Sequence, residues 1–253
     1  MKALVCLSLL SLIFVTTASA KSKYKLKKTR IAPRARFVEA GRRDPYKNYR
    51  AAHEWLKKVH PCYKKYSIEQ IANLKKLSLQ LYSRETVKLI TDANMVHVGK
   101  LKKLETLRVH RLIGSAGFAH FANLKKLKIL NAPNCINLTD SGLTCVKQMP
   151  QLENLVICAT KIGDSSMAHL KGRTGLRLLN ITRTKVSDAG FAKLKNLKNL
   201  NKLFISYTNL TDASVPIIKG FTHLNTLYMQ GTKISKAGKD EIAAALKGAR
   251  IVR

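Results

Sequence analysis

The chain has 253 residues, with 47 Lys or Arg against 14 Asp or Glu, and its formal net charge at pH 7 is +33. This length allows one elongated domain or two small ones, and the 45% of hydrophobic residues suffice for a sizeable core. A charge this basic favours a polyanionic neighbour, namely nucleic acid, anionic lipid or acidic polysaccharide, and the alternative is a highly soluble surface without a dedicated ligand.

The first residues form a distinct segment. A positively charged start is followed by an apolar run of about fifteen residues and then by the small residues Ala18, Ser19 and Ala20. This pattern predicts a secretory signal peptide over residues 1–20. A membrane anchor would need roughly 20 apolar residues, and a mitochondrial presequence would be Arg-rich and amphipathic. We therefore expect an exported protein, periplasmic or secreted, with a mitochondrial location as the alternative and no transmembrane segment in the mature chain.

Two further segments precede the main part of the chain. Residues 21–50 carry twelve Lys or Arg against two acidic residues, so we expect a disordered basic arm over residues 21–45. Residues 46–73 are expected to form an N-terminal helical cap, with an amphipathic helix over 46–59 and a second helix that starts at the capping box of Ser67 and Gln70. The sole tryptophan, Trp55, is predicted to plug this cap.

The pattern Leu-x-x-Leu-x-apolar recurs seven times after the cap and is the strongest signal in the chain. It occurs at Leu74/Leu77/Leu79, Leu104/Leu107/Val109, Leu127/Leu130/Ala132, Leu152/Leu155/Ile157, Leu176/Leu179/Ile181, Leu200/Leu203/Ile205 and Leu224/Leu227/Met229. The successive offsets are 30, 23, 25, 24, 24 and 24 residues. Because the apolar residues alternate with a period of two, each occurrence predicts a short strand with one buried face.

Two polar positions follow each predicted strand. Three residues after the strand comes a small side chain that we expect to stay inside the coil and bond the backbone: Cys135, Thr160, Thr184, Thr208 and Thr232. An aspartate then stands at the expected start of a helix, where its carboxylate would accept hydrogen bonds from free amides and suit the helix dipole. Five of the 14 acidic residues occupy this position: Asp92, Asp140, Asp164, Asp188 and Asp212.

The segment LRLLNITRTKVSDAGFAKLKNL resembles bacterial leucine-rich repeats of the type L-x-x-L-x-L-x-x-T-x-[VI]-[ST]-D-A-G, which are related to the cysteine-containing, helix-backed subfamily. The resemblance covers residues 74–253 and is most faithful from Leu152 onward. It is weaker in the first repeat, which has extra residues near 83–88, and in the second, which lacks the aspartate. The resemblance implies an α/β leucine-rich-repeat solenoid of about seven repeats, with a concave parallel β-sheet and α-helices on the convex side. It also implies binding, without specifying a shared ligand.

The chain ends in two further predicted elements. Ser235 is expected to cap a helix that continues to about Leu246. Ile251 and Val252 are then expected to add a last segment to the edge of the sheet.

Motifs for catalysis and metal binding are missing from the sequence. His53 and Glu54 begin like the zinc-protease motif HExxH, but Lys57 stands where the second histidine is required. Asp164 and Ser165 follow a glycine as in an esterase signature, but the repeat already explains this segment. The four cysteines after residue 20 match neither a metal-ligand spacing nor a dense disulfide framework, although one bridge is compatible with them (Cys62, Cys135, Cys145, Cys158). We expect no catalytic residues, no metal and no cofactor.

The residues expected to bind a partner point out of the concave sheet or follow it closely. They are Arg108, His110, Arg111, Asn131, Asn180, Arg183, Lys202, Phe204, Tyr207, Tyr228 and Gln230, with Asn134 and Ser206 beside them. Mixed aromatic and polar residues on a rigid sheet can form a recognition surface, and the alternative is an ordinary solvated face. The predicted function is an exported, non-enzymatic scaffold that binds a protein partner. The alternative is electrostatic attachment of the basic arm and basic surface to anionic lipid, acidic polysaccharide or nucleic acid.

Overall fold

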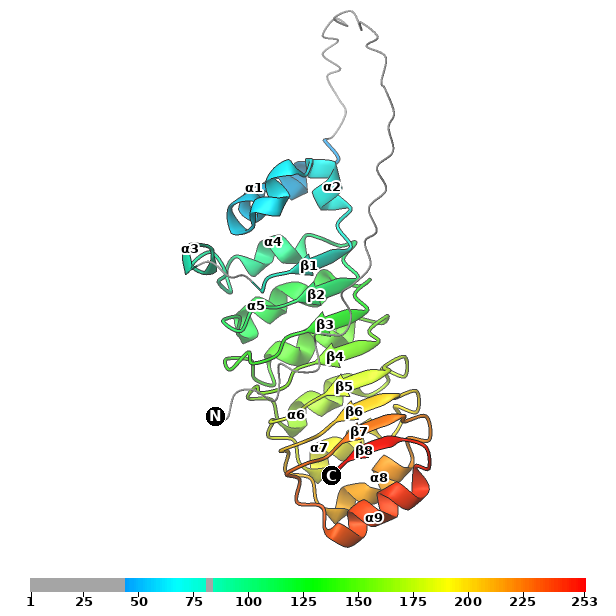
Figure 1. Ribbon diagram of the computed structural model, residues 1–253. Coiled ribbons are helices and arrows are strands. Elements are labelled where there is room, and N and C mark those ends of the chain that lie inside the picture. Colours follow the sequence, from blue (N-terminus) through cyan, green and yellow to red (C-terminus); the bar gives the residue numbers. More distant parts are fainter. Residues whose placement is uncertain (1–43, 81–83) are drawn as a thin grey trace, which may run out of the picture. The chain divides into compact units, whose positions relative to one another are not determined.

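Eight short strands in the described part of the chain form one parallel sheet, in which each strand pairs with the next along the sequence (Figure 1). Their bounds are β1 (Lys76–Ser78), β2 (Thr106–Arg108), β3 (Ile129–Asn131), β4 (Asn154–Val156), β5 (Leu178–Asn180), β6 (Lys202–Phe204), β7 (Thr226–Tyr228) and β8 (Arg250–Val252). The middle residue is a leucine in β1 to β7 and Ile251 in β8, and these residues pair in register across the sheet. The predicted α/β solenoid is confirmed, and the last segment adds an eighth strand at the edge.

The computed structural model describes residues 44–80 and 84–253. The described residues belong to one unit that begins at Asp44. The predicted signal peptide (1–20) and almost all of the predicted basic arm (21–45) lie outside the described residues. Within the described ranges, no helix is long and apolar enough to cross a membrane.

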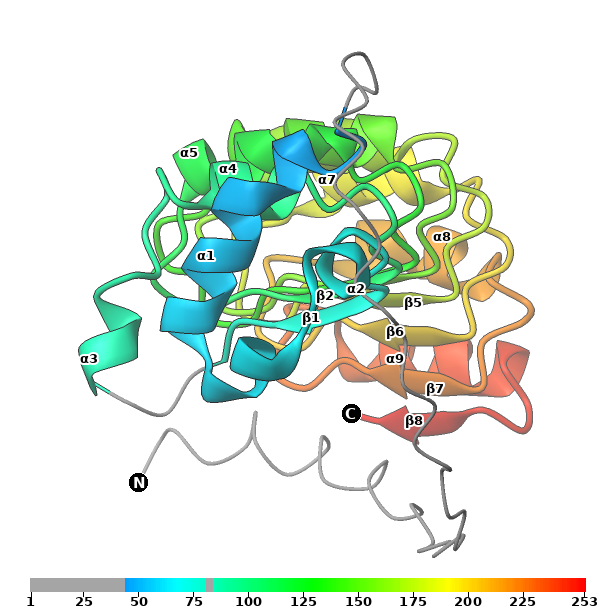
Figure 2. The same cartoon turned by 90° about the horizontal axis from the view of Figure 1, so that it is seen from above.

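Short helical segments run behind the sheet (Figure 2). The α-helices of the repeats are α3 (Arg84–Val87), α4 (Met95–Gly99), α5 (Ser115–Ala119), α6 (Asp164–Met167), α7 (Asp188–Phe191), α8 (Val215–Lys219) and α9 (Lys236–Ala245). Several of them are preceded, continued or replaced by 3₁₀ segments: His120–Asn123, Gly142–Gln148, Ala168–Leu170, Ala192–Leu194 and Asp212–Ser214. A coil of 24 residues must also hold a strand and two bends, so most of these segments complete only one or two turns.

The hydrophobic core runs without a break from Ala52 before the repeats to Leu246 after the last helix. The small polar position after each strand behaves as predicted. The hydroxyls of Thr160, Thr184 and Thr208 each donate to the carbonyl three residues earlier, at 2.8, 2.6 and 2.7 Å. These buried threonines therefore satisfy backbone groups where the chain turns away from the sheet.

The repeated aspartates bind the next coil, which corrects the prediction that each of them caps its own helix. The carboxylate of Asp164 accepts the backbone N–H of Ser187 at 2.7 Å and the Ser187 hydroxyl at 2.5 Å. Asp188 accepts in the same way from Thr211, at 3.0 and 2.6 Å. Ser187 and Thr211 are the N-cap residues of the following helical segments, and the stacking of coils places their N–H groups against the preceding aspartate. Each carboxylate therefore links two coils.

The same link recurs along the unit. The carboxylates of Asp92, Asp140 and Asp212 accept the backbone N–H groups of Gly114, Gly163 and Ser235, at 2.8, 2.7 and 2.8 Å. Each of the five aspartates faces a small residue of the next coil, namely Gly117, Ser166, Gly190, Ser214 or Gly238. A Cβ added to Gly190 would lie 2.3 Å from Oδ1 of Asp164. Ser214 occupies the equivalent position one coil later, and its hydroxyl donates to Asp188.

The cap consists of α1 (Arg50–Val59) and α2 (Ile68–Ala72), with 3₁₀ segments at Lys47–Tyr49 and Pro61–Lys65. Trp55 is only 6% exposed. Its ring stacks on His97 of α4 with the centroids 5.6 Å apart, and its indole N–H donates to the carbonyl of Leu89 at 3.2 Å. Trp55 thus fills the junction between α1 and the first coil, as predicted.

Two helix starts predicted from the sequence are confirmed. At α2, the Ser67 N–H donates to Oε1 of Gln70 at 2.8 Å and the Gln70 N–H donates to Oγ of Ser67 at 3.2 Å, which completes the capping box. At α9, Oγ of Ser235 accepts the N–H of Gly238 at 3.0 Å. Both bonds satisfy amides that the first turn of a helix leaves without an intrahelical partner.

Candidate functional site

The first and third residues of each strand lie on the side of the sheet opposite the buried middle residue, because successive strand residues point to opposite sides of a sheet. We call this surface the concave face, its first residues the amino row and its third residues the carboxyl row. The amino row is Lys76, Thr106, Ile129, Asn154, Leu178, Lys202, Thr226 and Arg250. The carboxyl row is Ser78, Arg108, Asn131, Val156, Asn180, Phe204, Tyr228 and Val252.

Three residues of β6 to β8 form what we call the aromatic stack: Phe204, Tyr228 and Arg250. The rings of Phe204 and Tyr228 lie 5.1 Å apart between centroids at an interplanar angle of 24°, a favourable stacked arrangement. The guanidinium carbon of Arg250 lies 6.0 Å from the centroid of the Tyr228 ring, within cation–π range. Both rings are half-buried. Phe204 and Tyr228 were predicted from the sequence as binding residues, but Arg250 was not. The position of Arg250 beside Tyr228 follows only from the register of the eighth strand.

A recurring backbone bend follows the strands, and we call its residues the turn row. Asn134, Ala159, Arg183 and Tyr207 have φ values of 60°, 54°, 55° and 57°, and Gly231 continues the row with 65°. The ring of Tyr207 covers Gly231, because a Cβ on that glycine would lie 2.4 Å from Cδ1 of the ring. The guanidinium carbon of Arg183 lies 5.1 Å from the same ring's centroid. Tyr207 therefore pairs with Arg183 at the border of the concave face, and it is 51% exposed.

The remaining predicted residues are spread over the face. Arg108 and Asn180 are half-buried in the carboxyl row, Lys202 is exposed in the amino row, and Gln230 is half-buried after β7. In the bend after β2, Arg111 is exposed and His110 is half-buried. Burial lowers the pKa of His110, and the charge of Arg111 lowers it further. The predicted residues thus gather into a dense group only at the C-terminal half of the sheet.

Two of the predicted surface residues are buried, which corrects their assignment to the binding surface. Asn131 is 7% exposed and Ser206 is 5% exposed. Asn131 has a short side chain and pairs with Arg108 and Val156 on the adjacent strands, so its access to solvent is small. The Ser206 hydroxyl accepts the backbone N–H of Gln230 at 3.1 Å and is engaged within the fold.

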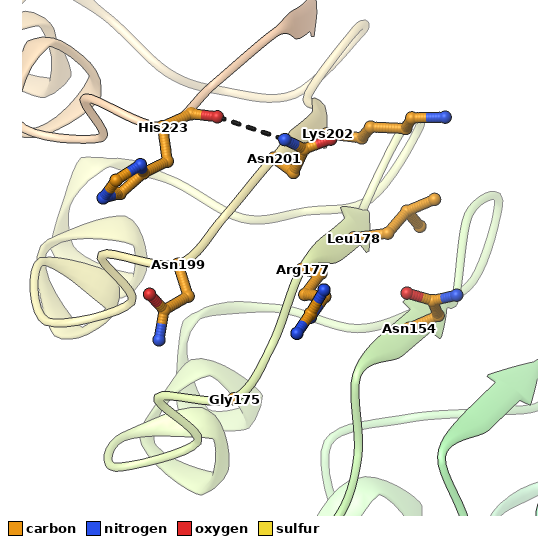
Figure 3. A pocket seen from close by; sticks show the side chains of 8 residues that line it. All are labelled: Asn154, Gly175, Arg177, Leu178, Asn199, Asn201, Lys202 and His223. Atoms are coloured by element: carbon orange, nitrogen blue, oxygen red, sulfur yellow. Dashed lines mark hydrogen bonds between the residues drawn. The ribbon is translucent and has the colours of Figure 1, made fainter.

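A polar hollow of about 580 Å³ lies at the amino ends of β4 to β6. In Figure 3, Arg177 lies between Asn199 and Asn154 in the middle of the view, and His223 and Lys202 lie above them. Within this group, Nδ2 of Asn201 donates to the carbonyl of His223 at 3.3 Å. Of these lining residues, only Lys202 was predicted from the sequence to bind a partner. The other lining residues precede the strands, where the repeat pattern sets no requirement that would mark them as functional.

The described residues give no sign of a metal centre, and two of the buried thiols, those of Cys135 and Cys145, are not activated. In residues 44–80 and 84–253, no three His, Cys, Asp or Glu side chains gather in a group that could hold a metal ion. Burial raises the pKa of both the Cys135 and the Cys145 thiol to about 12. Both thiols are therefore protonated at neutral pH and are poor nucleophiles.

The stacked coils, the buried leucine pattern and the short helices behind one parallel sheet define a leucine-rich-repeat fold. Solved structures of bacterial leucine-rich-repeat proteins share this fold. A leucine-rich-repeat protein of Leptospira interrogans matches with 23% identity and a TM-score of 0.50, over 74% of this chain and 44% of its own. Internalin C2 of Listeria monocytogenes matches with 18% identity and a TM-score of 0.53, over 80% of this chain and 91% of its own.

These similarities concern the fold. The match spans less than half of the Leptospira protein. No protein-family model and no curated protein matches the sequence. The chemistry of binding must therefore be argued from the residues of this chain.

Proposed function

We propose that this protein is a non-enzymatic scaffold that binds a protein partner through the C-terminal half of its concave face. The leucine-rich-repeat fold supports an interaction role in general. The observation that carries the proposal is the aromatic stack, in which Phe204 and Tyr228 lie 5.1 Å apart with Arg250 beside them. Aromatic residues and arginines supply most of the binding energy at protein interfaces.

The aromatic stack is held in place before any partner arrives. Its residues belong to adjacent strands in register, and the coils behind them are joined by the bonds from Asp188 to Thr211 and from Asp212 to Ser235. Side chains that are already ordered lose little conformational entropy on binding. The pair of Arg183 and Tyr207 extends this surface toward the turn row.

We further propose that the protein acts outside the cytoplasm, on the strength of the signal-peptide pattern in residues 1–20. The partner would then be another exported or surface-exposed protein. Because apolar rings and cation–π contacts depend weakly on ionic strength, this binding should persist at high salt.

A pull-down from the envelope fraction of the source cells tests this proposal. The expected result is a discrete partner that is retained at high salt and is lost with the Phe204→Ala/Tyr228→Ala double variant. Purified components should then show an affinity at least about tenfold lower for the double variant.

A matched control removes exposed apolar side chains outside the aromatic stack. Leu112 and Ile136 are 48% and 61% exposed, so Leu112→Ala/Ile136→Ala should leave the partner bound. If the aromatic and control variants retain the same proteins as the wild type, the aromatic stack is not the binding site.

A second candidate function is attachment to a polyanion. From residue 44 onward the chain has 36 Lys or Arg against 13 Asp or Glu, a net charge of +23, so the folded unit is strongly basic without the predicted arm. Attachment of this kind weakens steeply as salt rises, because each neutralised anion releases counterions. Deletion of residues 21–45 tests the contribution of the arm. If that deletion abolishes all retention while the aromatic variant changes nothing, the second candidate is correct and the scaffold proposal fails.

A further inference from the structure

The polar hollow at the amino ends of β4 to β6 exists because one coil lacks a side chain there. Gly175 occupies the position that Gln151 holds one coil earlier and Asn199 holds one coil later. A Cβ added to Gly175 would meet nothing within 4 Å. The space is therefore open to solvent and to a ligand, and it measures about 580 Å³.

The cations of the hollow have no carboxylate partner. Among the residues that the structure describes, neither Arg177 nor Lys202 forms an ion pair. The same edge of the sheet differs near its N-terminal end, where Glu105 pairs with Lys75 at 3.4 Å and with Lys128 at 3.3 Å. Glu105 thus neutralises Lys75 and Lys128 in the first coils. Arg177 and Lys202 at the hollow have no such partner among the described residues.

Further charged residues lie close to the lining residues along the chain or in the repeat register. Glu153 stands one coil before Arg177, at the residue that precedes the strand, and is the acidic residue nearest in the repeat register. Lys195 and Lys198 lie in the loop before β6, and Nζ of Lys198 donates to the carbonyl of Gly220. Lys171 and Arg173 lie in the corresponding loop before β5. The balance around the hollow is strongly positive, so a bound group should be negative.

The neutral lining indicates what else the ligand carries. Asn154, Asn199 and Asn201 offer amide groups, which both donate and accept hydrogen bonds as sugar hydroxyls require. The guanidinium of Arg177 can bind an anionic group through two parallel N–H bonds. No Phe, Tyr or Trp lines the hollow, so the stacking surface on which single-stranded nucleic acids depend is missing.

The spacing of the coils fits a chain of sugars. Arg177 and Lys202 line the hollow from successive coils, one residue out of register because Lys202 pairs with Leu178, and neighbouring strands lie about 4.8 Å apart in a β-sheet. This distance is close to the length of one sugar unit in an extended polysaccharide. We propose that the hollow binds an acidic sugar unit, carboxylated or sulfated, of a polysaccharide. This inference rests on the second candidate function, to which it gives a defined site, and is independent of the aromatic stack.

The test is a calorimetric titration of the purified protein with four probes: oligogalacturonate, a sulfated dextran oligomer, a neutral dextran oligomer and a single-stranded oligonucleotide. We expect oligogalacturonate or the sulfated oligomer to bind, and the better of the two identifies the anionic group. The neutral oligomer should not bind. Equal or tighter binding of the oligonucleotide would overturn the assignment to a sugar.

Four variants locate the site. Arg177→Ala and Lys202→Ala should each weaken acidic-sugar binding about tenfold or more, whereas Lys185→Ala, which removes an exposed lysine in the bend after β5, should change it less than about twofold. Gly175→Gln leaves the charge unchanged and should abolish binding by filling the hollow. Because its Cβ meets open space, this variant should fold, and its circular dichroism spectrum checks that. Phe204→Ala/Tyr228→Ala should bind the sugar normally.

Two outcomes separate this inference from the function on which it rests. If an acidic sugar binds but the variants at 175, 177 and 202 bind like Lys185→Ala, the hollow is not the site and polyanion attachment stands. If none of the anionic probes binds, the acidic-sugar site fails, and attachment to acidic polysaccharide or nucleic acid fails with it.

Discussion

At the scale of single residues, the approach of an aspartate to the small residue of the next coil sets how closely the coils stack. A Cβ on Gly190 would lie 2.3 Å from Oδ1 and 2.7 Å from Cα of Asp164. Because Cα belongs to the backbone, rotation of a side chain cannot relieve this clash. Gly175 is a suitable comparison, since the Cβ that it would gain meets nothing within 4 Å.

We therefore expect Gly190→Ala to lower the free energy of unfolding by about 1–3 kcal/mol, the usual effect of overpacking. Gly175→Ala should change it by less than about 0.5 kcal/mol. Urea titrations followed by circular dichroism compare the two variants. If both variants changed the unfolding free energy equally, the coils would separate easily at Asp164. The contact between Asp164 and Gly190 would then not limit how closely the coils stack.

The links between coils also predict a pH dependence. Burial raises the pKa of Asp188, but hydrogen bonds from the Ser214 and Thr211 hydroxyls and from the Thr211 amide outweigh it, and the pKa falls below its ordinary value of 3.8. A group whose pKa is lower in the folded state stabilises the fold above its unfolded pKa, and this contribution is lost as the pH falls through the folded pKa.

Asp188→Asn should accordingly destabilise the protein at neutral pH, because an amide accepts these bonds less strongly than a carboxylate. The difference in unfolding free energy from the wild type should be constant down to about pH 4 and shrink below it. Denaturation at a series of pH values measures this difference. A difference that keeps its full size in acid would exclude Asp188 as the source.

At the scale of elements, α1 packs on the first coil through buried apolar side chains, of which Trp55 is the largest. Trp55 is buried, stacks on His97 and donates to Leu89. Trp55→Ala should lower the unfolding free energy by about 3–5 kcal/mol, as other buried large-to-small changes do. Trp55→Phe keeps an aromatic ring but loses the indole hydrogen bond, so its effect should be smaller. Chemical denaturation followed by circular dichroism measures both, and a loss below about 1 kcal/mol for the alanine variant would contradict the role of Trp55 as a plug.

His97 makes this junction sensitive to mild acid. Burial lowers its pKa from the ordinary value of 6.5, and the charge of Lys100 lowers it further. Since its pKa is lower in the folded state, its contribution to stability is complete above pH 6.5 and declines as the pH falls through the folded pKa. His97→Gln should flatten the decline in stability that begins as the pH falls below 6.5. Burial lowers the pKa values of His110 and His169 too, so the readout is the difference between the wild type and the variant, and an unchanged slope would exclude His97.

The strands, the threonine position and the helix starts at Ser67 and Ser235 could be predicted from the sequence, because each depends on residues close together along the chain. The sequence could not predict the partner of the aspartates. Most coils carry an aspartate at the same position, so a periodic pattern cannot distinguish a bond within a coil from a bond to the next one. Asp164, for example, fits the start of its own helix and yet bonds Ser187.

The candidate sites likewise divide into features set by one repeat and features set by several coils. Phe204 and Tyr228 could be named from the sequence because strand alternation places them outward. The burial of Asn131 depends on the neighbouring strands, and the hollow depends on the missing side chain at Gly175. Both are properties of several coils together, and the pattern of one repeat does not contain them.

At the scale of the whole molecule, the continuous core should make residues 44–253 unfold as one unit. Each coil contacts mainly its neighbours, so cooperativity depends on the interfaces between coils. The buried cluster runs through all of them. We expect Trp55 fluorescence, which reports the N-terminal end, and far-ultraviolet circular dichroism, which reports all coils, to give the same midpoint in urea. Limited proteolysis should remove residues 21–45 and leave the rest intact, and rapid cutting between repeats or two separate midpoints would contradict a single unit.

The open edge of the last strand, β8, makes the positive charge of this protein important for keeping copies apart. Within the described residues, β8 pairs with β7 on one side and with no strand on the other (Figure 1). An open edge of this kind can recruit a strand from another molecule and start a fibre. Arg250 stands on this edge, and every copy carries the same large positive charge, so two copies that approach edge to edge repel each other. The lysines and arginines thereby act as a colloidal stabiliser, and salt or a bound polyanion that screens them would bring the protein closer to aggregation.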